Sequence, residues 1–315
     1  MVVAMRMASV GTTGIELSAI GLGGFELGET ASDAPAARAA IAAAMESGVN
    51  WVDTADEYHA TANESVIGEA LGGLPERPLI SSKRWPSGDS FSPAGIHAGC
   101  RDSLKRLGVD HLDLYFLHWP DDRIPLQKTW GAMAELADQG LVRAIGLSNY
   151  TLAQIEACHA ARPVDVIQDG LSLVDYPENR HKVAACGWQG IAAVIYEPLA
   201  SGLLAGAYAS AADVRARWGD DVDDYEFFGR LFGPGQEPRS MALTAELRRV
   251  AEQRGVGLAQ LAIAWVLAQP GVTSAICGSR NPEAVSSNSA AAGIELDDGA
   301  LAELEAVMQL GPAFA

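Results

Sequence analysis

The strongest constraint on the fold is a repeated alternation of short apolar runs with helix-forming segments along a chain of 315 residues. Such alternation is typical of βα units, which build parallel sheets. Eight apolar runs are predicted as strands, and they lie near residues 19–22, 50–53, 79–82, 112–117, 144–148, 164–168, 192–197 and 273–277.

Helix signals fall between these runs. The predicted helix starts lie at Asp33, Ser92, Thr151 and Asp297, where a short polar side chain can cap the first turn. Gly48 and Gly108 end the first two of these helices. One long irregular segment is expected at about 201–240, between the seventh and eighth strands. Because no Pro/Ser-rich linker divides the chain, residues 1–315 are predicted to form one α/β domain, a (β/α)8 TIM barrel with a long loop after strand seven.

A doubly wound Rossmann sheet is the competing architecture, since it also alternates strands and helices. It requires a Gly-x-Gly-x-x-Gly turn after a strand. Gly21, Gly23 and Gly24 approach this pattern, but Glu26 stands at the third glycine position and no other match occurs. A nicotinamide nucleotide, if one binds, is therefore not held in a Rossmann cradle.

Charge and composition exclude several kinds of partner. A net charge of −18 and a pI near 4.6 argue against nucleic acid and anionic membranes, because those surfaces demand clustered Lys and Arg. No apolar run approaches the length of a membrane span, so a cytoplasmic protein with a small-molecule substrate is expected. The cysteines are scattered without metal-site spacing, so we expect reduced, mostly buried thiols and no metal, at Cys100, Cys158, Cys186 and Cys277.

Polar residues gather at the predicted strand ends. In a (β/α)8 barrel these ends meet at one rim, where active sites lie. The second, third and fourth strands end at Asp53, Lys83 and His118, and later strands end at Ser148, Asn149, Gln168, Tyr196 and 278–280. Each residue taken alone has an ordinary structural explanation, such as a loop cap or a core histidine. Their joint placement at one rim favours a catalytic site.

Tyr58 follows Asp53 by five residues, so it can reach over the barrel mouth toward Lys83. A tyrosine hydroxyl has a pKa near 10, and a neighbouring Lys cation is expected to lower it. Asp53 is expected to hold Lys83 charged, and His118 to orient a substrate carbonyl oxygen. These four residues are the predicted catalytic set for carbonyl reduction.

Seven ordered segments resemble the aldo-keto reductase superfamily, from Gly11 to about Met308. They are GTTGIELSAIGLGG (11–24), VDTADEY (52–58), LISSK (79–83), DHLDLYFLHWPD (110–121), GLSNY (146–150), YEPLASGLL (196–204) and GSRNPE (278–283). The first resembles the opening β-hairpin and first strand of that family. Together they imply a barrel that binds NADPH or NADP+.

The resemblance implies roles at matching positions. The tetrad would be Asp53, Tyr58, Lys83 and His118. Ser148, Asn149 and Gln168 would bind the nicotinamide carboxamide, and Tyr196 would stack beneath that ring. Leu199, Ser201, Gly202 and Leu203 would contact the pyrophosphate, and Gly278, Arg280 and Asn288 the adenosine 2′-phosphate end.

Arg280 precedes a helix predicted to begin near Pro282, so a guanidinium and a helix N-terminus would face the same phosphate. The alternative is a surface ion pair between Arg280 and Glu283.

Two departures from the family pattern stand out. The segment after Tyr58 is YHATANE (58–64), without the usual glycine-rich turn, so easy access to positive φ is missing. Ala284 stands where related chains often carry Gln or Glu toward the adenine.

The expected function is reduction of an aldehyde or ketone, with sugar or aryl aldehydes as candidates. Aromatic residues that follow strand ends are substrate-pocket candidates, namely Phe25, Trp85 and Trp119. Tyr225, Phe227 and Phe228 lie in an acidic segment that is either a solvated face or a lid. Alternatives are a sugar dehydrogenase working in the oxidative direction and a nucleotide-sensing subunit such as the potassium-channel β subunits of this superfamily.

Overall fold

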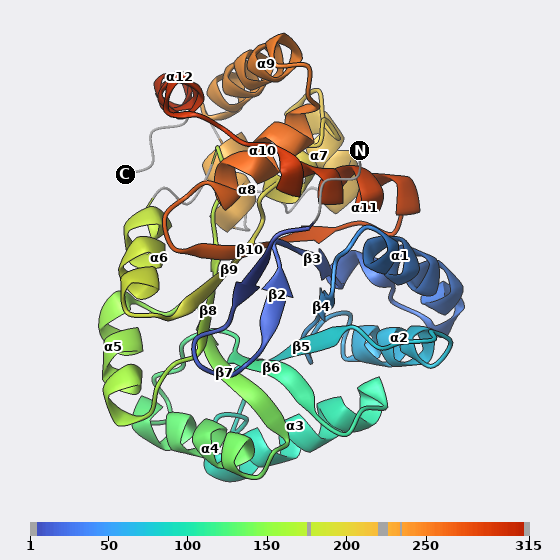
Figure 1. Cartoon of the computed structure of the whole chain (residues 1–315), viewed down its shortest axis with the longest axis vertical. Coiled ribbons are helices and arrows are strands. Elements are labelled where there is room, and N and C mark those ends of the chain that lie inside the picture. Colours follow the sequence, from blue (N-terminus) through green and yellow to red (C-terminus); the bar gives the residue numbers. More distant parts are fainter. Residues whose placement is uncertain (1–4, 175–177, 220–225, 234, 312–315) are drawn as a thin grey trace.

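The computed structural model describes residues 5–174, 178–219, 226–233 and 235–311. Within these residues, eight parallel strands close into a barrel in the order β10-β3-β4-β5-β6-β7-β8-β9 (Figure 1). The strands are β3 (Ile20–Gly23), β4 (Trp51–Asp53), β5 (Leu79–Arg84), β6 (Leu112–Leu117), β7 (Val142–Ser148), β8 (Val166–Gly170), β9 (Ala192–Tyr196) and β10 (Val272–Gly278). The predicted barrel is confirmed, and each predicted run overlaps one strand.

Helices surround the barrel as an outer ring (Figure 1). They are α1 (Ala34–Glu46), α2 (Ala62–Leu71), α3 (Pro93–Leu107), α4 (Leu126–Asp138), α5 (Leu152–Ala161), α6 (Asn179–Trp188), α7 (Ala211–Trp218), α8 (Glu226–Phe232), α9 (Glu237–Gln253), α10 (Leu258–Leu267), α11 (Pro282–Ser289) and α12 (Asp298–Met308). Short 3-10 helices occur at η1 (Phe25–Leu27), η2 (Ala31–Asp33), η3 (Ala200–Gly202) and η5 (Ala290–Gly293).

Three of the four predicted helix caps form. Asp33 precedes α1 but does not cap it, because its carboxylate accepts hydrogen bonds from the N–H groups of Glu29 and Thr30 instead. Ser92 accepts a hydrogen bond from the Gly95 N–H at the start of α3, and Gly108 ends this helix with φ 67°. Thr151 and Asp297 cap α5 and α12 in the same way. These side chains satisfy N–H groups that have no partner within the helix.

An antiparallel hairpin of β1 (Met7–Ser9) and β2 (Glu16–Ser18) lies across one end of the barrel (Figure 1), as the resemblance implied. Three of its apolar residues, Val10, Ile15 and Leu17, join the buried cluster inside the barrel. The strands contribute large side chains such as Trp51 and Phe116 to the same cluster. The interior is therefore a packed core below the rim, as barrels of this size require.

Trp51 shows why a glycine is needed in this interior. A Cβ at Gly21 would lie 2.2 Å from the Trp51 ring, so only glycine leaves room for the indole. The Trp51 Nε1–H donates to Ser274 Oγ over 3.2 Å, and Ser274 Oγ donates to the Ser18 carbonyl over 2.7 Å. The buried indole is thus fully hydrogen-bonded, which avoids the cost of an unpaired buried donor.

The segment between β9 and β10 is long, as predicted, but it is not irregular throughout. It contains η3, α7 and α8, and α9 begins at Glu237. Ser210 and Asp213 form a capping box at the start of α7, a local signal that the sequence analysis did not use. Tyr225, with residues 220–224, lies outside the described residues, and so do the side chains of Phe227 and Phe228.

The four cysteines are free and buried, as expected. In the part of the chain that the structure covers, none of the helices combines the length and the apolarity needed to cross a membrane.

Candidate active site

The four residues predicted to be catalytic meet at the carboxyl ends of neighbouring strands. Asp53 is the last residue of β4, Lys83 lies near the end of β5, and His118 follows β6. Tyr58 comes from the loop after β4, and its hydroxyl contacts Lys83. The structure therefore brings all four side chains to one rim of the barrel.

Lys83 is the centre of this cluster and is 0% exposed. Its ammonium donates to Asp53 Oδ2 over 2.6 Å, to the Thr54 carbonyl over 2.7 Å and to the Tyr58 hydroxyl over 3.1 Å. Burial favours the neutral amine, but Asp53 and Tyr58 together outweigh it and raise the pKa of Lys83. Lys83 is therefore a fixed, fully hydrogen-bonded cation.

Asp53 is held by two further donors. Ser81 Oγ donates to Asp53 Oδ1, and Gln168 Nε2 donates to the same oxygen over 3.0 Å. Ser81 was missed in the sequence, although it is the direct register partner of Asp53 on β5. The strand alternation that points Lys83 inward also points Ser81 inward, two residues earlier, and this signal could have identified it.

The prediction of a lowered Tyr58 pKa is wrong. Burial raises the pKa of Tyr58 above its ordinary value, and this effect outweighs the opposing field of Lys83. The carboxylates of Asp53 and Glu57 act in the same direction as burial. The hydroxyl is consequently kept protonated, so it is prepared to give up a proton rather than to accept one.

His118 lines the cavity and is only 8% exposed. Burial, followed by the charge of Lys83, lowers the pKa of His118 well below its ordinary value, so the imidazole is neutral. Its Nδ1 is buried without a hydrogen-bond partner and lies 3.6 Å from Glu57 Oε1. Glu57 was not singled out in the sequence, where it reads as an ordinary loop acid.

The residues predicted to bind the nicotinamide ring lie beside this cluster. Tyr196 donates its hydroxyl to Asn149 Oδ1 over 2.7 Å, and Asn149 Nδ2 donates to the His118 carbonyl over 3.0 Å. Asn149, Gln168 and Tyr196 line the cavity. Ser148 is buried behind them and accepts a hydrogen bond from Asn149 over 3.0 Å.

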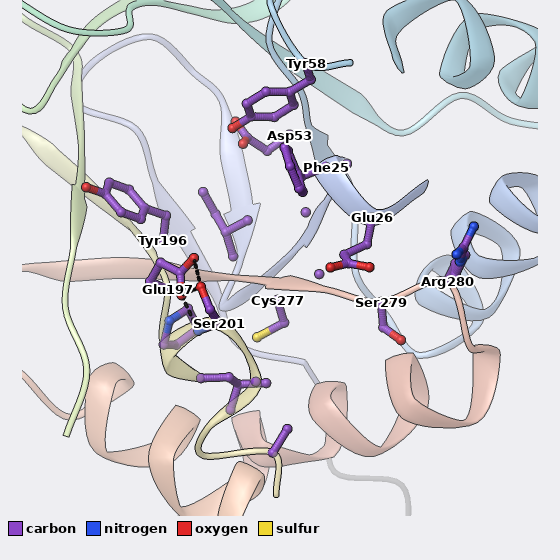
Figure 2. Close-up of a pocket in the computed structure, with 18 of the residues that line it drawn as sticks. Phe25, Glu26, Asp53, Tyr58, Tyr196, Glu197, Ser201, Cys277, Ser279 and Arg280 are labelled. Atoms are coloured by element: carbon purple, nitrogen blue, oxygen red, sulfur yellow. Dashed lines mark hydrogen bonds between the residues drawn. The ribbon is translucent and has the colours of Figure 1, made fainter. Parts of the chain in front are cut away.

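The segment predicted to contact the pyrophosphate follows β9. Leu199, Ser201 and Gly202 line the cavity, whereas the Leu203 side chain is buried in the hydrophobic core between the barrel and the helices. A residue outside the prediction, Glu197, also lines the cavity and accepts hydrogen bonds from the N–H and the hydroxyl of Ser201 (Figure 2).

The opposite end of the cavity is formed by Gly278 and Arg280, which leave β10 just before α11. The Arg280 side chain is 58% exposed and lies 3.7 Å from Asp33 Oδ1. The alternative ion pair with Glu283 is not the one that forms, since Asp33 is the carboxylate beside Arg280. Asn288 is buried in α11 and is not among the residues that line the cavity.

These groups share one cavity of about 750 Å³. Figure 2 shows Tyr58, Asp53 and Phe25 at one end, Tyr196 and Glu197 along one side, and Arg280 at the far end. The volume falls within the range of small-molecule and cofactor sites. Glu26 and Arg217 also line the cavity, and an ion pair of 3.0 Å between them links η1 to α7.

Two of the three aromatic candidates for the substrate pocket line the cavity, namely Phe25 and Trp119. Phe25 meets the Tyr58 ring edge-on with centroids 5.2 Å apart. Trp85 does not line the cavity, but its ring meets His118 edge-on at 5.3 Å and packs beside the site. Aromatic side chains therefore flank both Tyr58 and His118.

The loop that carries Tyr58 takes an unusual path. His59, Ala60 and Thr61 have φ values of 51°, 52° and 78°, three consecutive left-handed residues of which none is glycine. His59 is held by a contact of 2.9 Å between its Nε2 and the Phe25 carbonyl. The positive φ that the missing glycines would have allowed is thus adopted by residues for which it is strained.

Among the described residues, no group of three His, Cys, Asp or Glu side chains is arranged to hold a metal ion. The arrangement can perform acid–base chemistry, with a protonated phenol, a buried cation and a neutral imidazole around one space.

Comparisons with known proteins agree with this geometry. The family model described as "Aldo/keto reductase family" matches residues 19–309. The aldo-keto reductase YhdN of Bacillus subtilis (strain 168) is 31% identical over 293 residues, which cover 88% of this chain and 86% of that protein.

Among solved structures, the glycerol dehydrogenase AKR11B4 from Gluconobacter oxydans is similar, with a TM-score of 0.80 and 26% identity, covering 96% of this chain and 94% of that one. An aldo-keto reductase from Klebsiella pneumoniae in complex with NADPH has a TM-score of 0.77 and 29% identity, covering 98% and 97% of the two chains.

Proposed function

The chain belongs to the aldo/keto reductase family, and we propose that it reduces an aldehyde or ketone to the alcohol with NADPH as the hydride donor. The observation that carries this proposal is the contact of 3.1 Å between Lys83 Nζ and the hydroxyl of Tyr58 at the wall of the cavity. A protonated phenol beside a buried cation is a proton donor whose conjugate base would be stabilised.

The residues present fit a phosphorylated dinucleotide. The cavity extends from Tyr58 to Arg280. The Arg280 side chain is more than half exposed there, and the carboxylate of Asp33 lies 3.7 Å from its guanidinium. Such a guanidinium is available for bidentate binding of a phosphate. NADPH, when bound, would supply the hydride for the carbonyl carbon.

The other residues that would hold the cofactor follow from the cavity lining. Asn149 and Gln168 would bind the nicotinamide carboxamide, with Ser148 buried behind Asn149. The ring of Tyr196 would stack on the nicotinamide, and the hydrogen bond from the Tyr196 hydroxyl to Asn149 holds that ring in place. Leu199, Ser201 and Gly202 border the middle of the cavity, where Leu203 contributes buried packing.

His118 and Tyr58 would act together on the substrate oxygen. The neutral His118 imidazole carries one N–H, so it can donate a hydrogen bond and orient the carbonyl without adding a charge. Tyr58 then donates its proton as negative charge develops on the same oxygen, and Lys83 stabilises the tyrosinate that remains. Asp53, held by Ser81 and Gln168, keeps the ammonium in place.

The raised pKa of Tyr58 supports the reductive direction. Reduction needs the protonated phenol at the start, and burial favours this form. Alcohol oxidation would use the same residues with tyrosinate as the base, and it would require a higher pH. We therefore propose carbonyl reduction as the main activity and sugar or alcohol oxidation as the reverse reaction.

The substrate is proposed to be an uncharged carbonyl compound with a flat or apolar body. Phe25 and Trp119 border the cavity near Tyr58, and Trp85 packs against His118. Aromatic walls suit aryl aldehydes and the apolar faces of sugars. Glu57 lies near His118, so a carboxylate-bearing substrate would meet a like charge.

The function is tested by following NADPH absorbance with a panel of aryl aldehydes, aliphatic ketones, aldoses and keto acids. We expect turnover of at least one class, with aryl aldehydes ahead of keto acids. Tight NADPH binding without turnover of any panel member would instead favour the nucleotide-sensing role.

A further inference from the structure

The carboxylate of Glu197 occupies the hydrogen-bond donors of Ser201. Ser201 gives both its backbone N–H and its hydroxyl to this side chain, the hydroxyl over 2.8 Å (Figure 2). The segment around the contact is strained, because Glu197, Ala200 and Ser201 have φ values of 57°, 50° and 48°. The carboxylate thus holds a left-handed turn together from inside the cavity.

The charge of Glu197 has no cationic partner among the ion pairs of the described residues. The groups that face it are Glu26 of η1, which is itself paired with Arg217 of α7, and Tyr208, whose hydroxyl donates to the Ser201 carbonyl over 2.7 Å. Burial, opposed by the Ser201 hydrogen bonds, raises the pKa of Glu197. An uncompensated acidic group therefore borders the cavity.

We propose that Glu197 competes with the diphosphate of NADP(H) for the donors of Ser201 and thereby sets the affinity of this chain for its cofactor. The inference rests on the proposed function, which places the diphosphate along residues 199–203. A diphosphate is anionic and needs N–H and O–H donors, and here the N–H and the hydroxyl of Ser201 already serve a carboxylate.

Two routes would relieve the conflict when the cofactor binds. The Glu197 side chain either rotates away from Ser201, which costs the two hydrogen bonds, or takes up a proton and stays. Both routes weaken binding relative to a chain with a neutral side chain at this position. The second route also makes the affinity depend on pH, since an ionised Glu197 repels the diphosphate and a protonated one does not.

The test is isothermal titration calorimetry of the full chain with NADP+, comparing wild type with Glu197→Gln and Glu197→Ser. A matched control is Glu156→Gln, which neutralises an exposed carboxylate on α5, outside the cavity. Adenosine 2′-monophosphate serves as the ligand control, because it carries the 2′-phosphate and lacks the diphosphate. Thermal unfolding checks that each variant is folded.

We expect both Glu197 variants to bind NADP+ about tenfold more tightly than wild type, with Glu156→Gln and all affinities for adenosine 2′-monophosphate unchanged. Equal or weaker NADP+ binding by folded Glu197 variants would overturn the inference and leave the proposed function standing. Absence of NADP+ binding by wild type and every variant would overturn the proposed function itself.

The pH dependence of ligand binding by the wild-type protein provides a second test, which does not depend on whether the variants fold. As the pH rises above the ordinary carboxyl pKa of about 4.3, the ratio of the NADP+ affinity to the adenosine 2′-monophosphate affinity should fall as Glu197 ionises. The common 2′-phosphate cancels in this ratio. A ratio that rises with pH would contradict the proposal.

Discussion

The ammonium of Lys83 donates a hydrogen bond to the hydroxyl oxygen of Tyr58 over 3.1 Å, and its other two N–H groups donate to Asp53 and to the Thr54 carbonyl. Tyr58 thus faces a cation whose remaining hydrogen bonds are to protein groups. This contact predicts that Tyr58→Phe lowers kcat for carbonyl reduction by about 10²- to 10⁴-fold with little change in NADPH binding. Stopped-flow and fluorescence titration measure the two quantities. A variant with near wild-type kcat would show that Tyr58 is not the proton donor.

Asp53 and Lys83 should behave as one unit, because they form a buried ion pair of 2.6 Å. Removing one partner leaves the other charge unpaired and disturbs Tyr58. The double variant Asp53→Asn/Lys83→Met should therefore lose little more activity than either single variant. A double-mutant cycle on kcat measures the coupling, and simple additivity of the two losses would refute it.

Arg280 should distinguish NADPH from NADH. Its guanidinium is exposed at the cavity end, and the N-terminus of α11 follows immediately. Arg280→Ala is expected to weaken NADPH binding by about 2 kcal/mol, which lies within the range for a hydrogen bond to a charged group, while NADH binding hardly changes. Calorimetric titration with both cofactors checks this. Equal losses for the two cofactors would mean that Arg280 does not bind the 2′-phosphate.

A glycine in the left-handed turn after Tyr58 should stabilise the folded protein. Thr61 has φ 78°, is exposed and makes no side-chain cap at α2. Thr61→Gly should raise the free energy of unfolding by about 1 kcal/mol, because left-handed backbone is costly for any residue with a Cβ. Thr61→Ala is the control, since it keeps the strain. Urea unfolding measures both, and a Gly variant no more stable than the Ala variant would disprove the strain.

His118 should make the protein less stable as the pH falls. Its pKa is lowered well below the ordinary value of 6.5 in the folded state, so below about pH 6.5 the unfolded chain binds a proton that the folded chain does not. The free energy of unfolding should therefore fall with decreasing pH, by at most about 1.4 kcal/mol per pH unit from this group. His118→Gln should remove that part of the slope. Identical slopes for both proteins would contradict the assignment.

The sequence predicts the barrel and the tetrad well for a physical reason. Strand ends of a parallel barrel share one rim, so Asp53, Lys83 and His118 could be brought together from strand positions alone. Caps such as Ser92 act within a few residues and are equally visible.

Features that depend on local backbone or on burial were not predictable in the same way. The Glu197–Ser201 contact needs positive φ at residues that rarely adopt it, so the residue types in this segment do not predict the turn. The sign of the Tyr58 pKa shift depends on how far burial outweighs a nearby cation, and a sequence gives no measure of burial at a single hydroxyl.

The hairpin at the foot of the barrel bears on how protons reach the site. Val10, Ile15 and Leu17 fill the interior below the rim together with Trp51 and Phe116, so a packed apolar cluster closes the barrel on the side away from the cavity. A proton that Tyr58 gives to a substrate must then be replaced from the cavity side. Tyr58 would then regain its proton through the same cavity that the product occupies, which couples its reprotonation to product release.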